Sequence, residues 1–242
     1  MRERLELSLP VRVQCRESDD HEWVELTRLI DVTPFGARFT IARPTEPGRL
    51  LHMTLPMPRQ LRCFDHVEQQ YRVWALVRNI KPAVTASTSS NTVPRYEVGV
   101  AFVGKRPPAS FETDPTRRYE VASSPAESGL WSLQEPQERT FVPGALRPET
   151  RHNIPIDVIV EAFDENGQVS ASETTVTENI SRRGAAVFTS LDVARGRFVR
   201  LTSKQYQIAV IGAVRARRTG ADGITRLHLE FVDKQWPLEG IE

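Results

Sequence analysis

The sequence has few cysteines and no long apolar segment. Its 242 residues include two cysteines, Cys15 and Cys63, which are too few for a disulfide framework and predict reduced thiols. No stretch approaches the roughly 20 apolar residues of a membrane-spanning helix. The charged N-terminus also lacks the apolar core of a signal peptide. We therefore expect a cytoplasmic protein that does not insert into a membrane.

The charge balance and the histidine spacing exclude two further classes of site. The five histidines show no metal-ligand spacing, so no metal site is expected. Positive and negative charges nearly cancel, with a formal net charge of +1, whereas non-specific nucleic-acid binding needs a strong positive field. We therefore expect neither DNA nor RNA as a partner. Lysine is also scarce, so the basic residues are nearly all arginines, which suit bidentate recognition of planar anions.

Two strand-rich blocks flank a polar middle segment that contains several prolines. Short apolar segments recur between turn residues in each block, which is typical of small antiparallel barrels. The composition of the middle segment predicts a linker with at most one short helix, over 110–123 or 129–138. We therefore predict a mainly β fold with two six-stranded antiparallel barrels in tandem. Its parts are a first barrel over 1–104, a linker over 105–143 and a second barrel over 144–242.

Each block is expected to contribute six strands. At the start of the second block, Ile154, Ile156, Val158 and Val160 alternate on one face, and residues 164–167 (Asp-Glu-Asn-Gly) follow as a hairpin turn. The strands expected in the first block are Val11–Cys15, Val24–Asp31, Ala37–Ile41, Leu50–Leu55, Tyr71–Ile80 and Tyr96–Phe102. Those expected in the second block are Ile154–Glu161, Ser172–Ile180, Ala185–Thr189, Phe198–Leu201, Ile208–Arg215 and Arg226–Val232.

The two blocks repeat one another. The segment Asp31-Val-Thr-Pro-Phe-Gly36 aligns with Asn179-Ile-Ser-Arg-Arg-Gly184 at an offset of 148 residues. Upstream, Leu9–Val13 matches Ile154–Val158 at an offset of 145 residues. The offset changes where loops between strands would differ in length. We therefore interpret the chain as a tandem duplication.

The second block carries two polar motifs. Arg147 and Arg151 precede its first strand, and Pro148 between them disfavours a helix, which predicts an extended or turn-like arm. Asn179 and Ser181 are two residues apart, so on a strand their side chains lie on the same side. Gly184 follows, where a turn or a close backbone approach needs no side chain. Each motif alone could be structural, because arginine pairs are common on solvated faces and polar strand ends are common before turns.

Together, Arg-x-x-x-Arg and Asn-x-Ser-x-x-Gly resemble the paired motif of PilZ domains, which are small six-stranded barrels that bind cyclic di-GMP. The resemblance covers most of residues 145–234. It implies that the arginines grip guanine edges and phosphates, and that the Asn-x-Ser-x-x-Gly residues line the barrel face that receives a guanine. The residues it assigns to ligand binding are Arg147, Arg151, Asn179, Ser181 and Gly184, with Arg182 and Arg183 adding positive charge beside them.

The side-chain chemistry agrees with such a ligand. Arginine can donate two hydrogen bonds to guanine O6 and N7, which in groove readout discriminates by about 1–3 kcal/mol. It can also pair with phosphate and stack on a purine. Asn and Ser supply neutral donors and acceptors for a base edge. None of these groups is a nucleophile beside a base, so we expect binding without turnover and no enzyme activity.

The first block departs from the motif in its arginine arm. With the two prolines of the first strands aligned, Arg2 corresponds to the first arginine and Glu6 to the second. The barrel half of the motif is kept as Asp31, Thr33 and Gly36. A carboxylate at position 6 would repel a ligand phosphate, so we expect the first block to bind weakly or not at all.

Two functions remain open from the sequence. The first is a bacterial cyclic di-GMP receptor that relays the ligand by a change in domain arrangement or partner binding, in motility, exopolysaccharide or biofilm control. The alternative is an adaptor that binds no ligand and acts only through protein–protein contacts. The sequence identifies neither the protein partner nor the oligomeric state.

Overall fold

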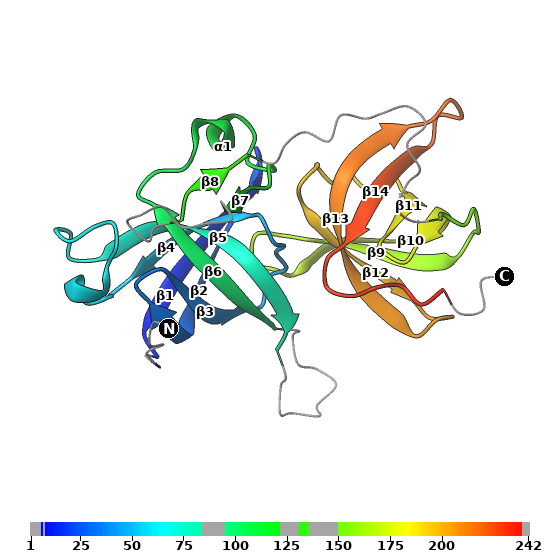
Figure 1. Cartoon of the computed structure of the whole chain (residues 1–242). Helices are drawn as coiled ribbons and strands as arrows, with labels where there is room; N and C mark the ends of the chain where they lie inside the picture. Colours follow the sequence, from blue (N-terminus) through cyan, green and yellow to red (C-terminus); the bar gives the residue numbers. More distant parts are fainter. Residues whose placement is uncertain (1–5, 7, 84–94, 122–130, 136–149, 239–242) are drawn as a thin grey trace. The chain divides into compact units, whose positions relative to one another are not determined.

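The computed structural model (Figure 1) describes residues 6, 8–83, 95–121, 131–135 and 150–238. The chain divides into two compact units, Met1–Pro136 and Gln137–Glu242. Each unit contains a closed six-stranded barrel in which all neighbouring strands pair antiparallel. The expected fold class, mainly β with two small barrels in tandem, is confirmed.

The first barrel closes in the strand order β1-β2-β3-β6-β5-β4. Alternate side chains point inward along each strand, as Val11, Val13 and Cys15 do on β1, and form the core. Burial raises the pKa of the Cys15 thiol. The strands are β1 (Pro10–Ser18), β2 (His21–Thr33), β3 (Gly36–Ile41), β4 (Leu50–Leu55), β5 (Tyr71–Pro82) and β6 (Tyr96–Gly104), with a 3-10 turn η1 (Arg59–Leu61) after β4.

The second barrel has the order β10-β11-β14-β13-β12-β9, which is the same arrangement when its strands are matched to those of the first barrel in sequence. The predicted turn at 164–167 joins β9 to β10, with the Gly167 N–H donating to the Asp164 carbonyl. The strands are β9 (Asp157–Phe163), β10 (Val169–Ser181), β11 (Gly184–Phe188), β12 (Phe198–Ser203), β13 (Ile208–Thr219) and β14 (Thr225–Phe231).

Strand β9 begins at Asp157, three residues later than the predicted start at Ile154. The reason is a side chain: the Thr177 hydroxyl donates to the Ile154 carbonyl over 2.7 Å and accepts from the Ile156 N–H over 3.0 Å. These bonds replace part of the strand ladder. Ile156 is still buried in the core, so the predicted apolar face is kept.

The duplication extends to the irregularities of the strands. A bulge interrupts the β2–β3 pairing between Leu29 and Asp31, and another interrupts the β10–β11 pairing between Thr177 and Asn179. A glutamate also recurs. Glu25 accepts from the Ala42 N–H, and its counterpart Glu173 accepts from the Ser190 N–H. A shared bulge and a shared carboxylate at matching places support the tandem duplication.

The hydrogen bonds of the first strands correct the predicted alignment upstream of the motif. The Leu29 N–H donates to the Leu9 carbonyl, and at the matching place the Thr177 N–H donates to the Ile156 carbonyl. Leu9 therefore matches Ile156, two residues beyond the predicted Ile154. The prolines misled the alignment, because Pro10 is the first residue of β1 whereas Pro155 lies two residues before β9.

Part of the predicted linker packs on the first barrel. Helix α1 (Ala109–Thr113) buries Phe111, and the buried Tyr119 ring packs with it against Leu50 and Leu76. The Tyr119 N–H donates to the Gly48 carbonyl over 2.8 Å. The two-residue strands β7 (Glu120–Val121) and β8 (Leu133–Gln134) pair with each other.

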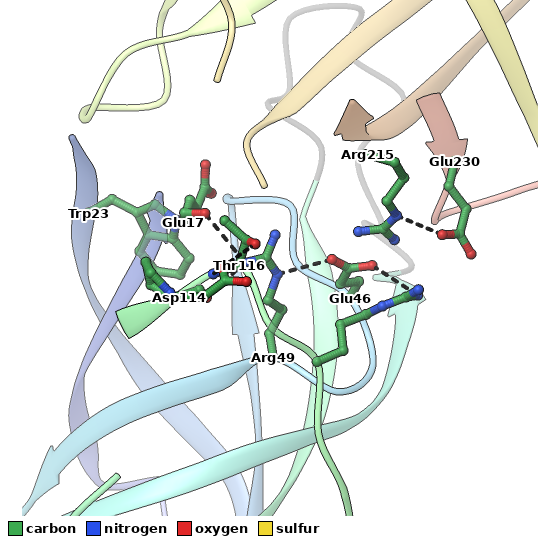
Figure 2. Close-up of polar contacts among 10 residues, drawn as sticks. Glu17, Trp23, Glu46, Arg49, Asp114, Thr116, Arg215 and Glu230 are labelled. Atoms are coloured by element: carbon green, nitrogen blue, oxygen red, sulfur yellow. Dashed lines mark hydrogen bonds and ion pairs between the residues drawn. The ribbon is translucent and has the colours of Figure 1, made fainter. Parts of the chain in front are cut away.

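Helix α1 is much shorter than the segment 110–123 that the sequence favours, and β8 occupies part of the alternative, 129–138. The helix stops at Asp114, whose backbone is extended, as is usual before a proline. Arg49 binds the residue that follows Asp114, which is Pro115. Its Nη1 donates to the Pro115 carbonyl over 3.2 Å. Its Nε donates to Glu46 over 3.0 Å (Figure 2). This buried arginine fixes the segment to the barrel.

Among the residues that the structure describes, no helix has the length and apolar character needed to cross a membrane.

Candidate functional site

The arm and the barrel halves of the predicted motif meet at one point. The Arg151 Nη1 donates to the Asn179 side-chain oxygen over 3.1 Å. The backbone brings them together, because His152 and Ile180 form an antiparallel bridge with N–H to carbonyl distances of 2.8 and 2.9 Å. Arg147, the other predicted arm residue, lies outside the described residues.

Ser181 and Gly184 shape the turn between β10 and β11. The Ser181 hydroxyl donates to the Gly184 carbonyl over 3.3 Å, and both residues are buried. A Cβ atom on Gly184 would lie 2.4 Å from the Leu229 carbonyl oxygen of the neighbouring strand β14. Glycine is therefore required by close backbone packing. In the first barrel, Thr33 and Gly36 make the same turn.

Arg182 and Arg183 occupy the tip of this turn with exposed side chains. Their backbone carbonyls hold the C-terminal segment: that of Arg182 accepts from the Trp236 N–H over 2.8 Å, and that of Arg183 accepts from the Phe231 N–H over 2.7 Å. The turn is therefore fixed at its backbone while its two guanidinium groups reach the solvent.

A row of residues crosses four neighbouring strands beside Arg151. Asn179 on β10 lies opposite Ala186 on β11, which lies opposite His228 on β14, which lies opposite Ala216 on β13. The residues on either side of Ala186 and His228 belong to the core cluster, so the row lies on the outer face of the barrel. Sequence reasoning missed His228, because only the strand register places it near the motif.

Charges surround His228. Burial and then Arg218 and Arg151 hold the pKa of His228 below its usual value, against the opposing effect of Glu178. Glu178 also accepts from Arg226 Nε over 2.6 Å. The face therefore combines a cluster of arginines with an imidazole that stays neutral at neutral pH.

The matching face of the first barrel is filled by its own side chains. Arg38, the counterpart of Ala186, donates from Nε to Asp31 over 2.6 Å and from Nη1 to Glu97 over 3.1 Å. On the next strand, the counterpart of His228 is Gly99, where a Cβ atom would lie 2.7 Å from Asn79 Oδ1. Asp31 is thus already paired by an arginine from within the barrel.

The corrected register also changes the expected arm of the first barrel. Leu9 matches Ile156, and the same offset places Arg4 at the position of Arg151. Glu6, which was expected at that position, matches Asn153 instead. Glu6 is exposed, while Arg4 and the predicted Arg2 lie outside the described residues. The expected repulsion by Glu6 at the arm position therefore loses its basis.

Within the described parts of the chain, no group of three or more His, Cys, Asp or Glu side chains is placed to hold a metal ion.

Comparison with curated proteins finds no match. Among solved structures, the chain is similar to the Bacillus subtilis inhibitor of motility MotI/DgrA, at 13% identity over 95% of this chain and 90% of that chain, with a TM-score of 0.31. It is similar to Borreliella burgdorferi PlzA in complex with c-di-GMP, at 9% identity over 98% and 90%, with a TM-score of 0.28. It is also similar to Escherichia coli YcgR in complex with c-di-GMP, at 10% identity over 93% and 76%, with a TM-score of 0.29.

A scan against protein families matches residues 145–235 to the PilZ domain. The match spans both predicted motifs and all six strands of the second barrel. The second barrel of this chain is therefore a PilZ domain, preceded in tandem by a barrel with the same strand order.

Proposed function

We propose that this chain is a bacterial receptor for cyclic di-GMP and that it binds the dinucleotide at its PilZ domain. The observation that carries the proposal is the hydrogen bond between Arg151 and Asn179, which joins the arm motif to the barrel motif. Both motifs lie inside the region that matches the family. A guanidinium and an amide at one place offer the donors and acceptors that a guanine edge and a phosphate need.

Each motif residue has a distinct part in this proposal. Arg151 and Arg147 hold guanine O6 and N7 or a phosphate, and the Asn179 amide binds a base edge. Ser181 and Gly184 act by fixing the turn rather than by offering side chains, since one is bonded within the turn and the other has none. The exposed Arg182 and Arg183 add positive charge for the phosphates. None of these groups is placed as a nucleophile, so the ligand is bound and not turned over.

The first barrel is proposed not to bind the dinucleotide with comparable affinity. The support is Arg38, whose side chain pairs with Asp31 at the place where the PilZ domain offers Asn179 beside an alanine. A ligand there would have to displace an ion pair that includes a buried carboxylate. Such a displacement leaves Asp31 uncompensated and is unfavourable.

The ligand signal is proposed to pass on by a change in domain arrangement or in partner binding, in the control of motility, exopolysaccharide or biofilm formation. The arm is suited to such a relay because it connects the preceding part of the chain to the bound ligand. A segment that orders on ligand binding can couple a site to the geometry of its neighbours.

A second candidate is an adaptor that works through protein contacts alone. One observation favours it: the outer face of β2 exposes Val24, Leu26 and Ile30, and Leu26 is 78% exposed. The matching residues of the PilZ domain are polar (Ser172, Thr174, Glu178). An apolar stripe present on one copy of a duplicated barrel is suited to a protein partner.

The test is a titration of the full chain with cyclic di-GMP, repeated with Arg147→Ala and with Arg151→Ala. We expect both variants to lose most of the affinity while their thermal unfolding matches that of the unchanged chain. Unchanged affinity in both variants would rule out the proposed site. A full chain that binds no ligand would favour the adaptor.

A further inference from the structure

The outer face beside Asn179 is shaped differently in the two barrels. In the PilZ domain, the row from Asn179 through Ala186 and His228 to Ala216 crosses four strands, or about 14 Å at the usual strand spacing. Two of its members are alanines, and the partly exposed imidazole of His228 is the largest side chain of the row, next to the buried Ala186.

The first barrel reverses this pattern of large and small residues. Its row runs from Asp31 through Arg38 and Gly99 to Asn79. The large residue there stands on β3 and is bound at both sides, to Asp31 and to Glu97. In the PilZ domain the β11 position is Ala186, and the large residue stands on β14. The two copies therefore keep the same strand pairings on this face and differ in the side chains that stand on it.

The groups that face His228 come from every neighbouring element. Arg151 belongs to the arm, Arg218 to β13, Arg226 to β14 itself and Glu178 to β10. Arg226 is also held by Glu178 and by Asp222. A neutral imidazole among these cations presents a flat aromatic face, one N–H donor and one acceptor nitrogen. Such a group can stack on a purine or bond to its edge.

We infer that His228 contacts a guanine base of the bound dinucleotide directly, on the outer face that it shares with Asn179. This inference rests on the proposed function, because it names a further binding residue at the same site. His228 belongs to neither motif. It adds an aromatic contact to a site whose other proposed elements are arginines and an amide.

The first experiment is a titration of the full chain with cyclic di-GMP. Stacking of a base on an aromatic side chain strengthens binding by roughly tenfold or more. His228→Ala should therefore weaken the affinity by that factor. Ala186→Arg, which copies Arg38 of the first barrel, should abolish binding by placing a large side chain between Asn179 and His228. His66→Ala, an exposed histidine of the first barrel, is the matched control and should bind unchanged.

The outcomes distinguish a failure of the proposed function from a failure of the inference about His228. If the unchanged chain does not bind, the proposed function fails. If it binds and His228→Ala binds equally well, the proposed function stands and the inference is overturned. Should Ala186→Arg fail to fold, the His228 variant still decides, because His228 is partly exposed on the outer face.

A second readout reports contact rather than stability. The ring proton on Cε1 of each of the five histidines gives a separate NMR signal, and His228→Gln identifies the signal of His228. On saturation with cyclic di-GMP, a guanine stacked on the imidazole should shift that signal upfield by its ring current. A ligand that saturates the protein and leaves that signal in place would contradict the inference.

Discussion

The Arg151 guanidinium donates a hydrogen bond to the Asn179 side chain across 28 residues of sequence. The bond joins the two motifs that the sequence predicts for ligand binding. The neighbouring backbone bridge between His152 and Ile180 holds both residues in place. The backbone of the PilZ domain therefore places the Arg151 side chain beside that of Asn179.

Replacing Arg151 by lysine should show how much of the binding depends on the positive charge and how much on the shape of the guanidinium group. Lysine keeps the positive charge but lacks the planar fork that bonds two guanine acceptors or two phosphate oxygens at once. We expect Arg151→Lys to weaken cyclic di-GMP binding by about 1–3 kcal/mol. Titration of the full chain measures this loss. An affinity equal to that of the unchanged chain would mean that the arm acts as a point charge only.

Gly184→Ala should destabilise the PilZ domain. The added Cβ would lie 2.4 Å from the Leu229 carbonyl oxygen, and a backbone atom cannot move away easily. We expect a loss of about 1–3 kcal/mol in the free energy of unfolding, measured by chemical denaturation. Ser181→Ala removes one hydrogen bond of 3.3 Å and should cost about 1 kcal/mol. A larger loss for Ser181→Ala than for Gly184→Ala would contradict this account of the turn.

Arg38→Ala should destabilise the first barrel without changing ligand affinity. Asp31 is buried and would lose the group that pairs with its carboxylate. The arginine side chain is 37% exposed, so solvent weakens the pair and we expect about 1 kcal/mol of destabilisation. The double variant Arg38→Ala with Asp31→Ala should recover part of the loss. A strong change in cyclic di-GMP affinity would place ligand on the first barrel.

His228 should titrate below the usual histidine range. Its pKa is lowered by burial and then by Arg218 and Arg151, so Arg218→Gln should raise it toward the usual value of about 6.5. Because the folded chain binds the proton less readily than the unfolded chain, stability falls as pH drops through the usual pKa toward the folded one. His228→Gln should remove that part of the pH dependence. NMR titration of the imidazole signal checks the direction, and a pKa above the usual value would contradict it.

Most strands were predictable because they have a clear apolar pattern and the two blocks repeat, although β10 is mostly polar. The repeat also identified the motif turn, since Gly36 and Gly184 stand at the same place for the same steric reason. The register of the first strands was not predictable. It depends on hydrogen bonds such as that from the Thr177 N–H to the Ile156 carbonyl, whereas aligning Pro10 with Pro155 suggests a different register.

Other features depend on contacts that no local pattern encodes. His228 becomes a neighbour of the motif through three strand pairings. The sequence does not distinguish Arg38 from the other arginines, because only the folded barrel places it between Asp31 and Glu97. Phe111 and Tyr119 are isolated aromatics in a polar segment, and only the surface of the first barrel gives them a place to be buried.

The most direct test of the central claim is calorimetric titration of the full chain with cyclic di-GMP, with Arg151→Ala measured beside it at the same salt concentration. We expect saturable binding at micromolar or tighter affinity in the unchanged chain. We also expect Arg151→Ala to lose essentially all of the binding heat while it unfolds at the same temperature. Absence of binding in the unchanged chain, or equal binding in the variant, would contradict it.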